Sequence, residues 1–377
     1  MNWAMTNRVK MRCTKFASTF ALGLAAAAGM LAQPQTPSAP KTENAKIEQR
    51  SVAGSLAQTV DSWAKSANHA QWLAYSVPAV GGNRQVCCGD GNWNGNNGGC
   101  GPCRLEGSEH GSNINLRGDK VELEGPRRMI ILLRADAGKI GKVRVVSEDC
   151  TIDAGGLEVI WLAGVNPAES VRYLEKFVAS QEFDEHGHDR LSRGALTAIA
   201  LHADPSADQA IATFTSPDRP EELRREASFW AGEARGAAGL ALLKRMAKSD
   251  SSPEVRAHVA FALSVSREND AVDEMIRMAH EDASTHVRGQ ALFWLAQKAG
   301  KKVASTITGA IDNDPDTEVK KKAVFALSQM PKDEGVPKLI EVAQNNRNPE
   351  VRKQAMFWLG QSNDPRAVDF FEKVLSK

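Results

Sequence analysis

The 377-residue sequence lacks the short motifs that mark common catalytic sites. It contains no His-Glu-x-x-His zinc motif, no Gly-x-Ser-x-Gly nucleophile turn and no glycine loop that would cradle phosphate groups. It also lacks an excess of basic residues, because 47 lysines and arginines stand against 46 acids. A generic nucleic-acid-binding protein would be basic, so nucleic acid is not an expected partner. We assign no catalytic residue, no metal site and no cofactor, and expect a protein that is not an enzyme.

The N-terminal segment has the pattern of an export signal. Four cations and no acid occur in the first 15 residues, and an apolar run follows from residue 16 to residue 31. A basic start before an apolar run of this length is typical of a cleaved signal peptide, to which we assign residues 1–32. The run is short for a spanning helix, so we expect a periplasmic or secreted mature chain without a membrane span. Cleavage would change the formal net charge from +1 to about −3.

A second region begins after a stretch rich in Pro, Thr, Ser, Lys and Glu, residues 33–50, which we interpret as a linker. Glycine, asparagine and cysteine are crowded between residues 81 and 111, and short apolar segments bounded by turn residues predict strands. The expected elements are a helix at 51–65, strands at 71–77, 120–123, 129–134, 142–147 and 157–162, and a helix at 167–179. The sequence therefore predicts a small, Cys-rich, β-rich α+β domain over residues 51–165.

The rest of the chain repeats itself every 32 residues. Phenylalanine keeps this interval at Phe229, Phe261, Phe293, Phe325 and Phe357. A leucine or valine followed by a cation keeps the same interval, and the apolar positions within each copy follow helical rather than strand spacing. A second apolar run follows the first in each copy. The sequence thus predicts an α-solenoid of about six helical hairpins over residues 167–377.

Two segments carry a resemblance to a known family. PEVRAHVAFALS at 253–264 and PEVRKQAMFWLGQSNDPRAVDFFEKVL at 349–375 resemble HEAT repeats of the short type first described in phycobilin lyases, and the resemblance covers roughly residues 190–377. It implies stacked hairpins that hold a protein or peptide on a surface lined by the second helices. Lyase activity on bilins is not implied, because no chromophore pocket can be identified.

The resemblance also implies a ladder between repeats. HEAT families use an Asp six residues before the cation of each unit to bond successive units, and four units keep that spacing here. The ladder residues are Asp218 with Arg224, Asp250 with Arg256, Asp282 with Arg288, Asp314 with Lys320, and finally Arg352, which Asn346 precedes in place of an Asp. We interpret that last change as suiting a terminal unit. Alternatively, the cations form a solvent-facing stripe for an acidic ligand.

The residue after each phenylalanine alternates between a large and a small side chain. In order, these residues are Trp230, Ala262, Trp294, Ala326 and Trp358. Stacked helices approach to about 10 Å, so an indole has room to lie over the alanine of the next unit. We therefore assign the phenylalanines and tryptophans to the repeat core. The alternative is an exposed tryptophan stripe for a peptide or a glycan.

The chain after the predicted signal contains five cysteines: Cys87, Cys88, Cys100, Cys103 and Cys150. In an exported chain they are candidates for two disulfides with one thiol left over, in a connectivity that the sequence leaves open. Cys100-Gly-Pro-Cys103 also reproduces a thioredoxin-type dithiol motif, although the strand before it and the long helix after it are missing. Zinc bound by Cys87 or Cys88 with Cys100 and Cys103 is a third possibility.

One histidine-rich segment precedes the repeats. His186 and His188, with Asp184, Glu185 and Asp189, could hold a divalent metal or could form a solvated loop, and we assign no metal to them. The function that these patterns favour is an exported, non-enzymatic scaffold that binds a protein or peptide on its solenoid. The alternative is an enzyme or enzyme accessory with thiol–disulfide or metal chemistry in the Cys-rich domain.

Overall fold

The computed structural model describes residues 39–81, 84–88, 103–106, 112–116, 128–179, 190–299 and 303–376. The predicted signal peptide, the strand expected at 120–123, Cys100 and the histidine-rich segment lie outside these residues. In the part of the chain described, no helix combines the length and apolarity needed to cross a membrane. Residues 37–377 belong to one compact unit.

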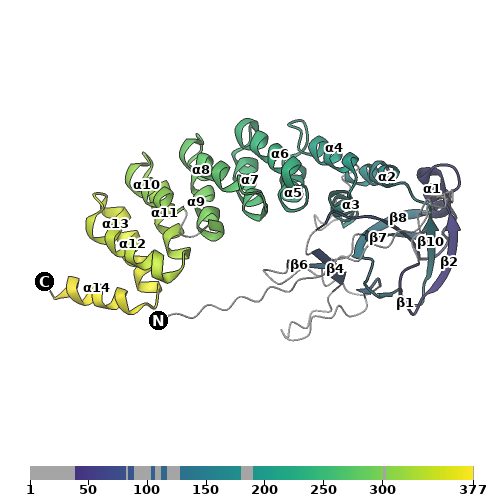
Figure 1. Ribbon diagram of the computed structural model, residues 1–377, viewed down its shortest axis with the longest axis horizontal. Helices are drawn as coiled ribbons and strands as arrows, with labels where there is room; N and C mark the ends of the chain where they lie inside the picture. Colours follow the sequence, from purple (N-terminus) through teal and green to yellow (C-terminus); the bar gives the residue numbers. More distant parts are fainter. Residues whose placement is uncertain are drawn as a thin grey trace, which may run out of the picture. The chain divides into compact units, whose positions relative to one another are not determined.

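A five-stranded sheet in the order β2-β10-β3-β7-β8 is the centre of the N-terminal region (Figure 1). Its strands are β2 (Lys46–Ser51), β3 (Gln71–Pro78), β7 (Arg128–Asp136), β8 (Lys139–Ser147) and β10 (Glu158–Ala163). Strand β10 runs parallel to both β2 and β3, whereas β3, β7 and β8 pair in antiparallel fashion. The hairpin of β7 and β8 is the one that the apolar segments at 129–134 and 142–147 predicted.

The prediction of a linker over residues 33–50 is wrong for the second half of this range. Residues there form β2 and the short strand β1 (Thr42–Glu43), which pairs with β9 (Ile152–Asp153). Strand β9 pairs in turn with β5 (Cys103–Arg104), and β4 (Arg84–Cys88) pairs with β6 (Ser112–Leu116). The sequence gives little sign of β2 because all six of its residues are exposed, so the strand lacks an apolar face and is held by backbone bonds to β10.

Both faces of the five-stranded sheet are buried along its central strands β10, β3 and β7. Along β3, Leu73, Tyr75 and Val77 point to one face, whereas Trp72 and Ala74 point to the other. The first face packs on helices α1 (Leu56–Ser66), α2 (Pro167–Ala179) and α3 (Arg190–Leu201), and the second packs on β5 and β9. A sheet covered on both sides explains why β3 reads as a continuous apolar run.

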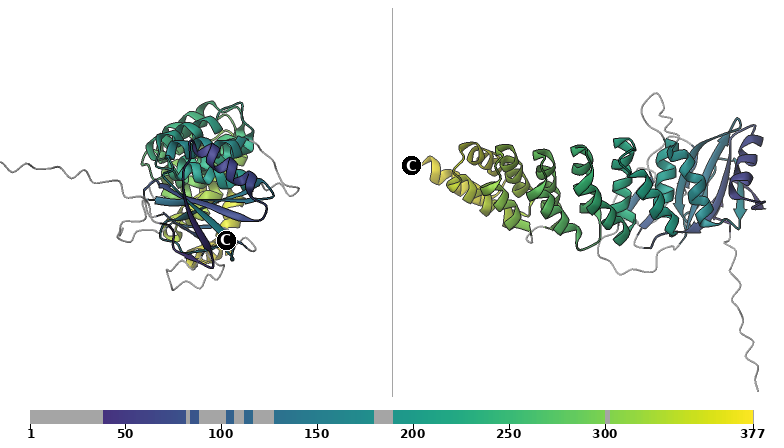
Figure 2. Two further views of the ribbon diagram at one scale, coloured as in Figure 1. Left: turned by 90° about the vertical axis from the view of Figure 1, so that its right-hand side faces the viewer. Right: turned by 90° about the horizontal axis from the view of Figure 1, so that it is seen from above.

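The C-terminal region is a helical solenoid, as the 32-residue period predicted. Its twelve described helices form six hairpins that follow one another in chain order (Figure 2). They are α3 (Arg190–Leu201), α4 (Pro205–Phe214), α5 (Glu221–Ala234), α6 (Gly236–Ser249), α7 (Pro253–Val265), α8 (Ala271–Glu281), α9 (Thr285–Ala299), α10 (Ala304–Asn313), α11 (Thr317–Gln329), α12 (Lys332–Asn345), α13 (Pro349–Gln361) and α14 (Pro365–Leu375). The odd-numbered first helices pack closely on one another, whereas the even-numbered second helices approach one another less closely.

Local sequence sets the start of the first helices. Ser252, Asp316 and Asn348 each precede a first helix, and each side chain accepts a backbone N–H of the first turn. Pro253 and Pro349 occupy the first helical position, where the missing amide hydrogen costs nothing. These caps set where α7, α11 and α13 begin, and they depend only on residues within the first turn.

The solenoid is joined directly to the sheet. Helix α3 lies so close to β8 that a Cβ built on Gly194 would be 2.2 Å from the carbonyl oxygen of Val143. Beyond β3, the amide of Val80 donates to the Leu201 oxygen (2.8 Å), and the amide of Ala203 donates to the Pro78 oxygen (3.0 Å). The first hairpin is thus part of the covering layer of the sheet as well as the first unit of the stack.

Candidate functional site

Three ion pairs join successive repeats. Arg224, Arg256 and Arg288 each donate two hydrogen bonds to an aspartate that lies 26 residues further on, in the next repeat. The two distances are 3.0 and 3.1 Å for Asp250, 2.8 and 3.0 Å for Asp282, and 2.8 and 3.0 Å for Asp314. Bidentate pairs of this kind fix orientation as well as distance. We call these three pairs the rungs.

The predicted pairing of each cation with the aspartate six residues before it is therefore wrong. What the six-residue spacing places within reach is a backbone oxygen: Arg256 donates to the Asp250 oxygen at 2.8 Å, and Arg288 to the Asp282 oxygen at 2.9 Å. The carboxylate of that aspartate points to the preceding repeat. Burial alone would raise the pKa of Asp282, but hydrogen bonds from Arg256 and from the Ser284 amide lower it overall.

The ladder does not continue to the C-terminus. Lys320 donates to the Asp312 backbone oxygen at 2.8 Å, and Asn346 occupies the position where an aspartate would receive it. Both partners of this rung differ at once, so Asn346 is explained by Lys320 rather than by the chain end. Arg352 bonds the Asn346 oxygen at 2.8 Å. At the other end, Asp218 has a side chain that is 76% exposed and lies 3.9 Å from Arg219.

An aromatic row runs along the first helices beside the rungs. Phe229 stacks on Phe261 with ring centroids 5.8 Å apart, and Phe293 stacks on Phe325 at 5.7 Å. Trp294 connects these two pairs, since it packs on both Phe261 (4.7 Å) and Phe293 (4.9 Å). Trp358 extends the row, because it packs on Phe325 at 4.8 Å and on Phe357 at 5.0 Å. Each of these two indoles thus lies against the phenylalanine of the preceding unit, and the row repeats every two units.

The sequence predicted these side chains in the repeat core, and Trp230 is buried there, but the phenylalanines are only partly buried. Phe229, Phe261, Phe293 and Phe325 are half-buried, and Phe357 is 54% exposed. The fully buried positions of the first helices carry alanine, valine and leucine instead. The rings pack against aromatic side chains of neighbouring repeats and remain partly exposed. This surface belongs to the first helices, whereas the resemblance led us to expect the second helices to line the binding surface.

A buried polar network joins the sheet to the solenoid. The Tyr75 and Ser170 hydroxyls are 2.8 Å apart, and the Ser170 hydroxyl lies 3.0 Å from His202 Nε2, while Nδ1 lies 2.7 Å from the Ala198 oxygen. Burial raises the pKa of Tyr75 and lowers that of His202 to about 4. Because all three side chains are fully buried, the Ser–His pair is a structural connection with no access for a substrate. Sequence reasoning missed it; the only signal is a polar residue within each apolar run.

Two of the cysteines lie in the core between the sheet and β9. Cys103 is 0% exposed and Cys150 is 1% exposed, and both belong to the same apolar cluster as Trp72 and Trp161. The Cys103 amide donates to the Thr151 oxygen at 2.7 Å, next to Cys150. Cys87 and Cys88 lie on β4. Within the described ranges, no group of three or more His, Cys, Asp or Glu residues could hold a metal.

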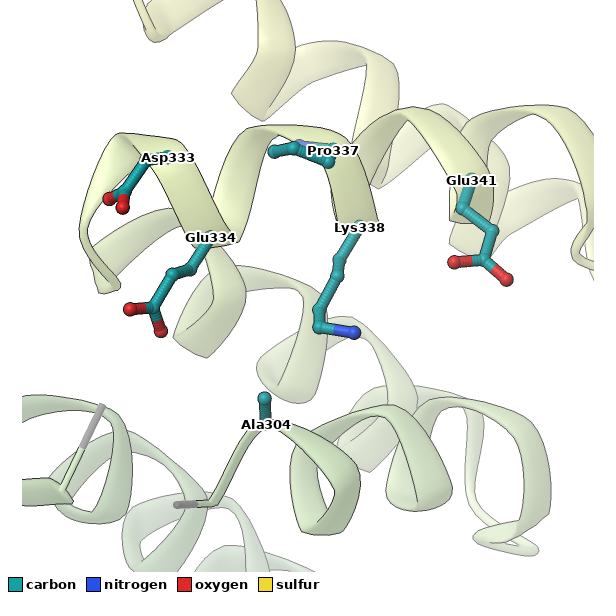
Figure 3. A pocket seen from close by; sticks show the side chains of 6 residues that line it. All are labelled: Ala304, Asp333, Glu334, Pro337, Lys338 and Glu341. Atoms are coloured by element: carbon teal, nitrogen blue, oxygen red, sulfur yellow. The ribbon is translucent and has the colours of Figure 1, made fainter. Parts of the chain in front are cut away.

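The second helices carry a shallow hollow between α10 and α12, of about 420 Å³ (Figure 3). Asp333, Glu334, Glu341 and Lys338 line it with Ala304 and Pro337. Its carboxylates point apart rather than towards one centre (Figure 3). We assign it no function.

Comparison with known proteins agrees with the repeat pattern. A family model described as HEAT repeats matches residues 208–296, 272–347 and 304–377. Among curated proteins, none matches the sequence. Human deoxyhypusine hydroxylase is 14% identical, with a TM-score of 0.29, over 55% of this chain and 90% of that one. Kap121p is 13% identical, with a TM-score of 0.36, over 55% of this chain and 27% of that one.

The complex of CpcE and CpcF of phycocyanin lyase from a Nostoc species is also similar, at 17% identity and a TM-score of 0.29 over 55% of this chain and 80% of that one. With identities and TM-scores this low, these structures carry no argument about this chain. The family match and the observed hairpins lead to one conclusion. The C-terminal region of this chain is a solenoid of HEAT repeats.

Proposed function

We propose that this protein is an exported scaffold, without catalytic activity of its own, that binds a protein or peptide along the first helices of its solenoid. The observation that carries the proposal is the aromatic row, which continues through five repeats with every phenylalanine partly open to solvent. Rows of aromatic side chains on a rigid surface are the usual anchors of protein interfaces. The fold alone does not name a partner.

The rungs support this proposal because they keep the row rigid. In each rung the aspartate accepts two hydrogen bonds from the arginine and one from a backbone amide. Asp250, for example, accepts from the Ser252 amide at 2.9 Å as well as from Arg224. A surface that is already ordered loses little conformational entropy when a partner binds. These bonds occupy Arg224, Arg256 and Arg288, which argues against the alternative of a stripe for an acidic ligand.

We further propose that Cys103 and Cys150 form a disulfide with each other, as suits an exported protein. They share one buried cluster, and the backbone of Cys103 bonds the residue next to Cys150. A bond there would tie β5 and β9 to the second face of the sheet. A Cys103–Cys150 bond would also occupy the thiol that would have to resolve a mixed disulfide at Cys100 in thioredoxin-type exchange, so the two proposals exclude each other.

Selection from a displayed random-peptide library tests the scaffold proposal. Peptides selected on the full mature chain should bind Phe325→Ala and Phe357→Ser at least tenfold more weakly. Glu341→Ala, on a second helix, is the matched control and should bind as the parent does. Thermal unfolding of each variant separates lost binding from lost fold. Equal affinity of folded parent and folded Phe variants would contradict the proposal.

A further inference from the structure

Two first helices end in a cap made by a cation from the next first helix. Arg235, which follows α5, donates to the oxygens of Ala200 (3.0 Å) and His202 (2.7 Å) at the end of α3. Lys298 of α9 donates to the oxygens of Ser264 (2.8 Å) and Ser266 (2.5 Å) at the end of α7. In register, these are the same two carbonyl positions, 64 residues apart. Both satisfy carbonyls that a helix end leaves without an intrahelical donor.

These caps follow the two-unit period of the tryptophans. The cap of α7 comes from a helix with Trp294, and the cap of α3 comes from the chain just after a helix with Trp230. Helix α13 carries the third tryptophan, Trp358, but has Ser362 where α9 has Lys298. The Ser362 hydroxyl turns back and donates to the Leu359 oxygen of its own helix at 2.7 Å. The third unit of this period therefore keeps the tryptophan but lacks the capping cation.

A hollow of about 200 Å³ lies at this third position, between α11, α12 and α13. Ser328 and Met330, whose oxygens correspond to those that Lys298 caps, line it together with Trp358 and Ser362. No side chain among the described residues donates to these two oxygens. The indole Nε1 of Trp358 is buried and has no hydrogen-bond partner in the described part of the chain. Apolar walls come from Leu339, Val336 and Leu327.

We propose that this hollow binds the side chain of a lysine from the partner protein, in the place that Lys298 fills two repeats earlier. The inference rests on the proposed function and adds a chemical class to it. An ammonium group brings three donors to two carbonyl oxygens, and its four-carbon stem packs on the apolar walls and the indole face. A peptide oxygen next to that lysine would accept from Trp358 Nε1.

Lys332 is the cation on the rim of the hollow. It is exposed. It competes with an incoming ammonium through charge repulsion, so Lys332→Ala should bind lysine more tightly. The opposite result, weaker binding by Lys332→Ala, would indicate an anionic ligand and overturn the proposal.

The probe is Nα-acetyl-lysine methylamide, and its control is the norleucine analogue, which lacks only the ammonium group. In the full mature chain with ¹⁵N-labelled tryptophan, the indole resonance of Trp358, assigned by Trp358→Phe, should shift with the lysine probe. Half-saturation on the order of 1 to 10 mM is expected for a ligand of this size. The norleucine analogue should bind at least tenfold more weakly.

Ser362→Lys supplies the internal cation that α13 lacks. It should raise the melting temperature and weaken the lysine probe at least tenfold, whereas Ser362→Ala should bind the probe as the parent does. Equal shifts with the norleucine analogue, or full binding by Ser362→Lys, would overturn the proposal. The probe needs no partner, so its failure leaves the peptide selection untouched. Selected peptides that lack lysine, or that ignore Ser362→Lys, would overturn the lysine proposal while leaving the scaffold proposal in place.

Discussion

The two regions of this molecule are held together in different ways. In the solenoid the same few contacts recur between neighbours: a rung, an aromatic stack and a buried Val/Ala/Leu layer. In the β-rich region most contacts occur once and join distant segments, such as the pairing of β2 with β10. A repeated contact leaves a period in the sequence, whereas a single long-range contact leaves none. The comparison predicts that damage stays local in the solenoid and spreads in the sheet.

The largest effect is expected from Arg288→Ala. Its side chain is buried at the rung, so removal leaves the Asp314 carboxylate buried without its cation and destabilises by about 3 to 5 kcal/mol. Arg352→Ala is the matched control, because the Arg352 side chain donates to the backbone oxygens of Asn346 and Arg347 in its own repeat. Chemical denaturation measures the difference, and hydrogen exchange should show the loss confined to α9 to α14. Hydrogen exchange that rises equally in β3 and β7 would contradict the expectation that damage in the solenoid stays local.

Replacing Cys103 and Cys150 by serine tests the other region. If the proposed disulfide ties β5 and β9 to the sheet, the double variant should lose about 2 to 5 kcal/mol. Hydrogen exchange should then rise across β3, β7 and β10 together, with α11 to α14 unaffected. Mass spectrometry after alkylation without reductant checks the premise. Modification of either cysteine in the folded protein would contradict the proposed bond.

Acid should weaken the junction between the regions. The pKa of His202 is about 4 in the folded protein and near 6.5 when unfolded, so the unfolded chain binds the proton first. The stability it contributes is complete above pH 6.5 and is lost as pH falls towards 4, by about 3 kcal/mol in all. His258, with its pKa also lowered to about 4 by burial, acts in the same direction. Denaturation from pH 7 to 4 in His202→Gln and His258→Gln separates the two; an unchanged slope in His202→Gln would contradict the assignment.

Gly194→Ala tests the contact of α3 with β8. A methyl group there would meet the Val143 oxygen at 2.2 Å, so the helix must move away, at a cost of about 1 to 3 kcal/mol. Gly360→Ala is a suitable control, since nothing lies within 4 Å of its added Cβ. The melting temperatures of the two variants are compared with each other and with that of the parent. Equal values would mean that α3 can move from the sheet without cost.

The smallest effect is a gain. Lys320→Arg together with Asn346→Asp should create a fourth rung and stabilise the last two hairpins by about 1 kcal/mol. Each single change should give less, because either one leaves the new group without its partner. A double-mutant cycle by urea denaturation measures the coupling. Additive single changes would show that the helices at this step are not placed for a rung.

Much of the solenoid could be predicted because each helix repeats its own pattern of apolar residues and caps. Phe229 and its four equivalents located the units correctly, yet the sequence did not show that these rings stay partly exposed. An interval of 32 residues places a ring on a given face of a helix but does not say what covers it. The partners within the rungs were predicted wrongly for a related reason. Asp250 lies six residues before Arg256 and 26 after Arg224, and the sequence carries both intervals equally well.

The sequence by itself determined the period, the hairpins and the caps, because these depend on residues within one or two turns of each other. Tertiary structure decided which repeat supplies each partner of a rung, that Cys103 and Cys150 share one core, and that Tyr75, Ser170 and His202 meet. It also decided that a hollow lies beside Ser362, at the position equivalent to the one that the Lys298 side chain fills. Such contacts join residues that are far apart along the chain, so only the packing of the elements brings them together.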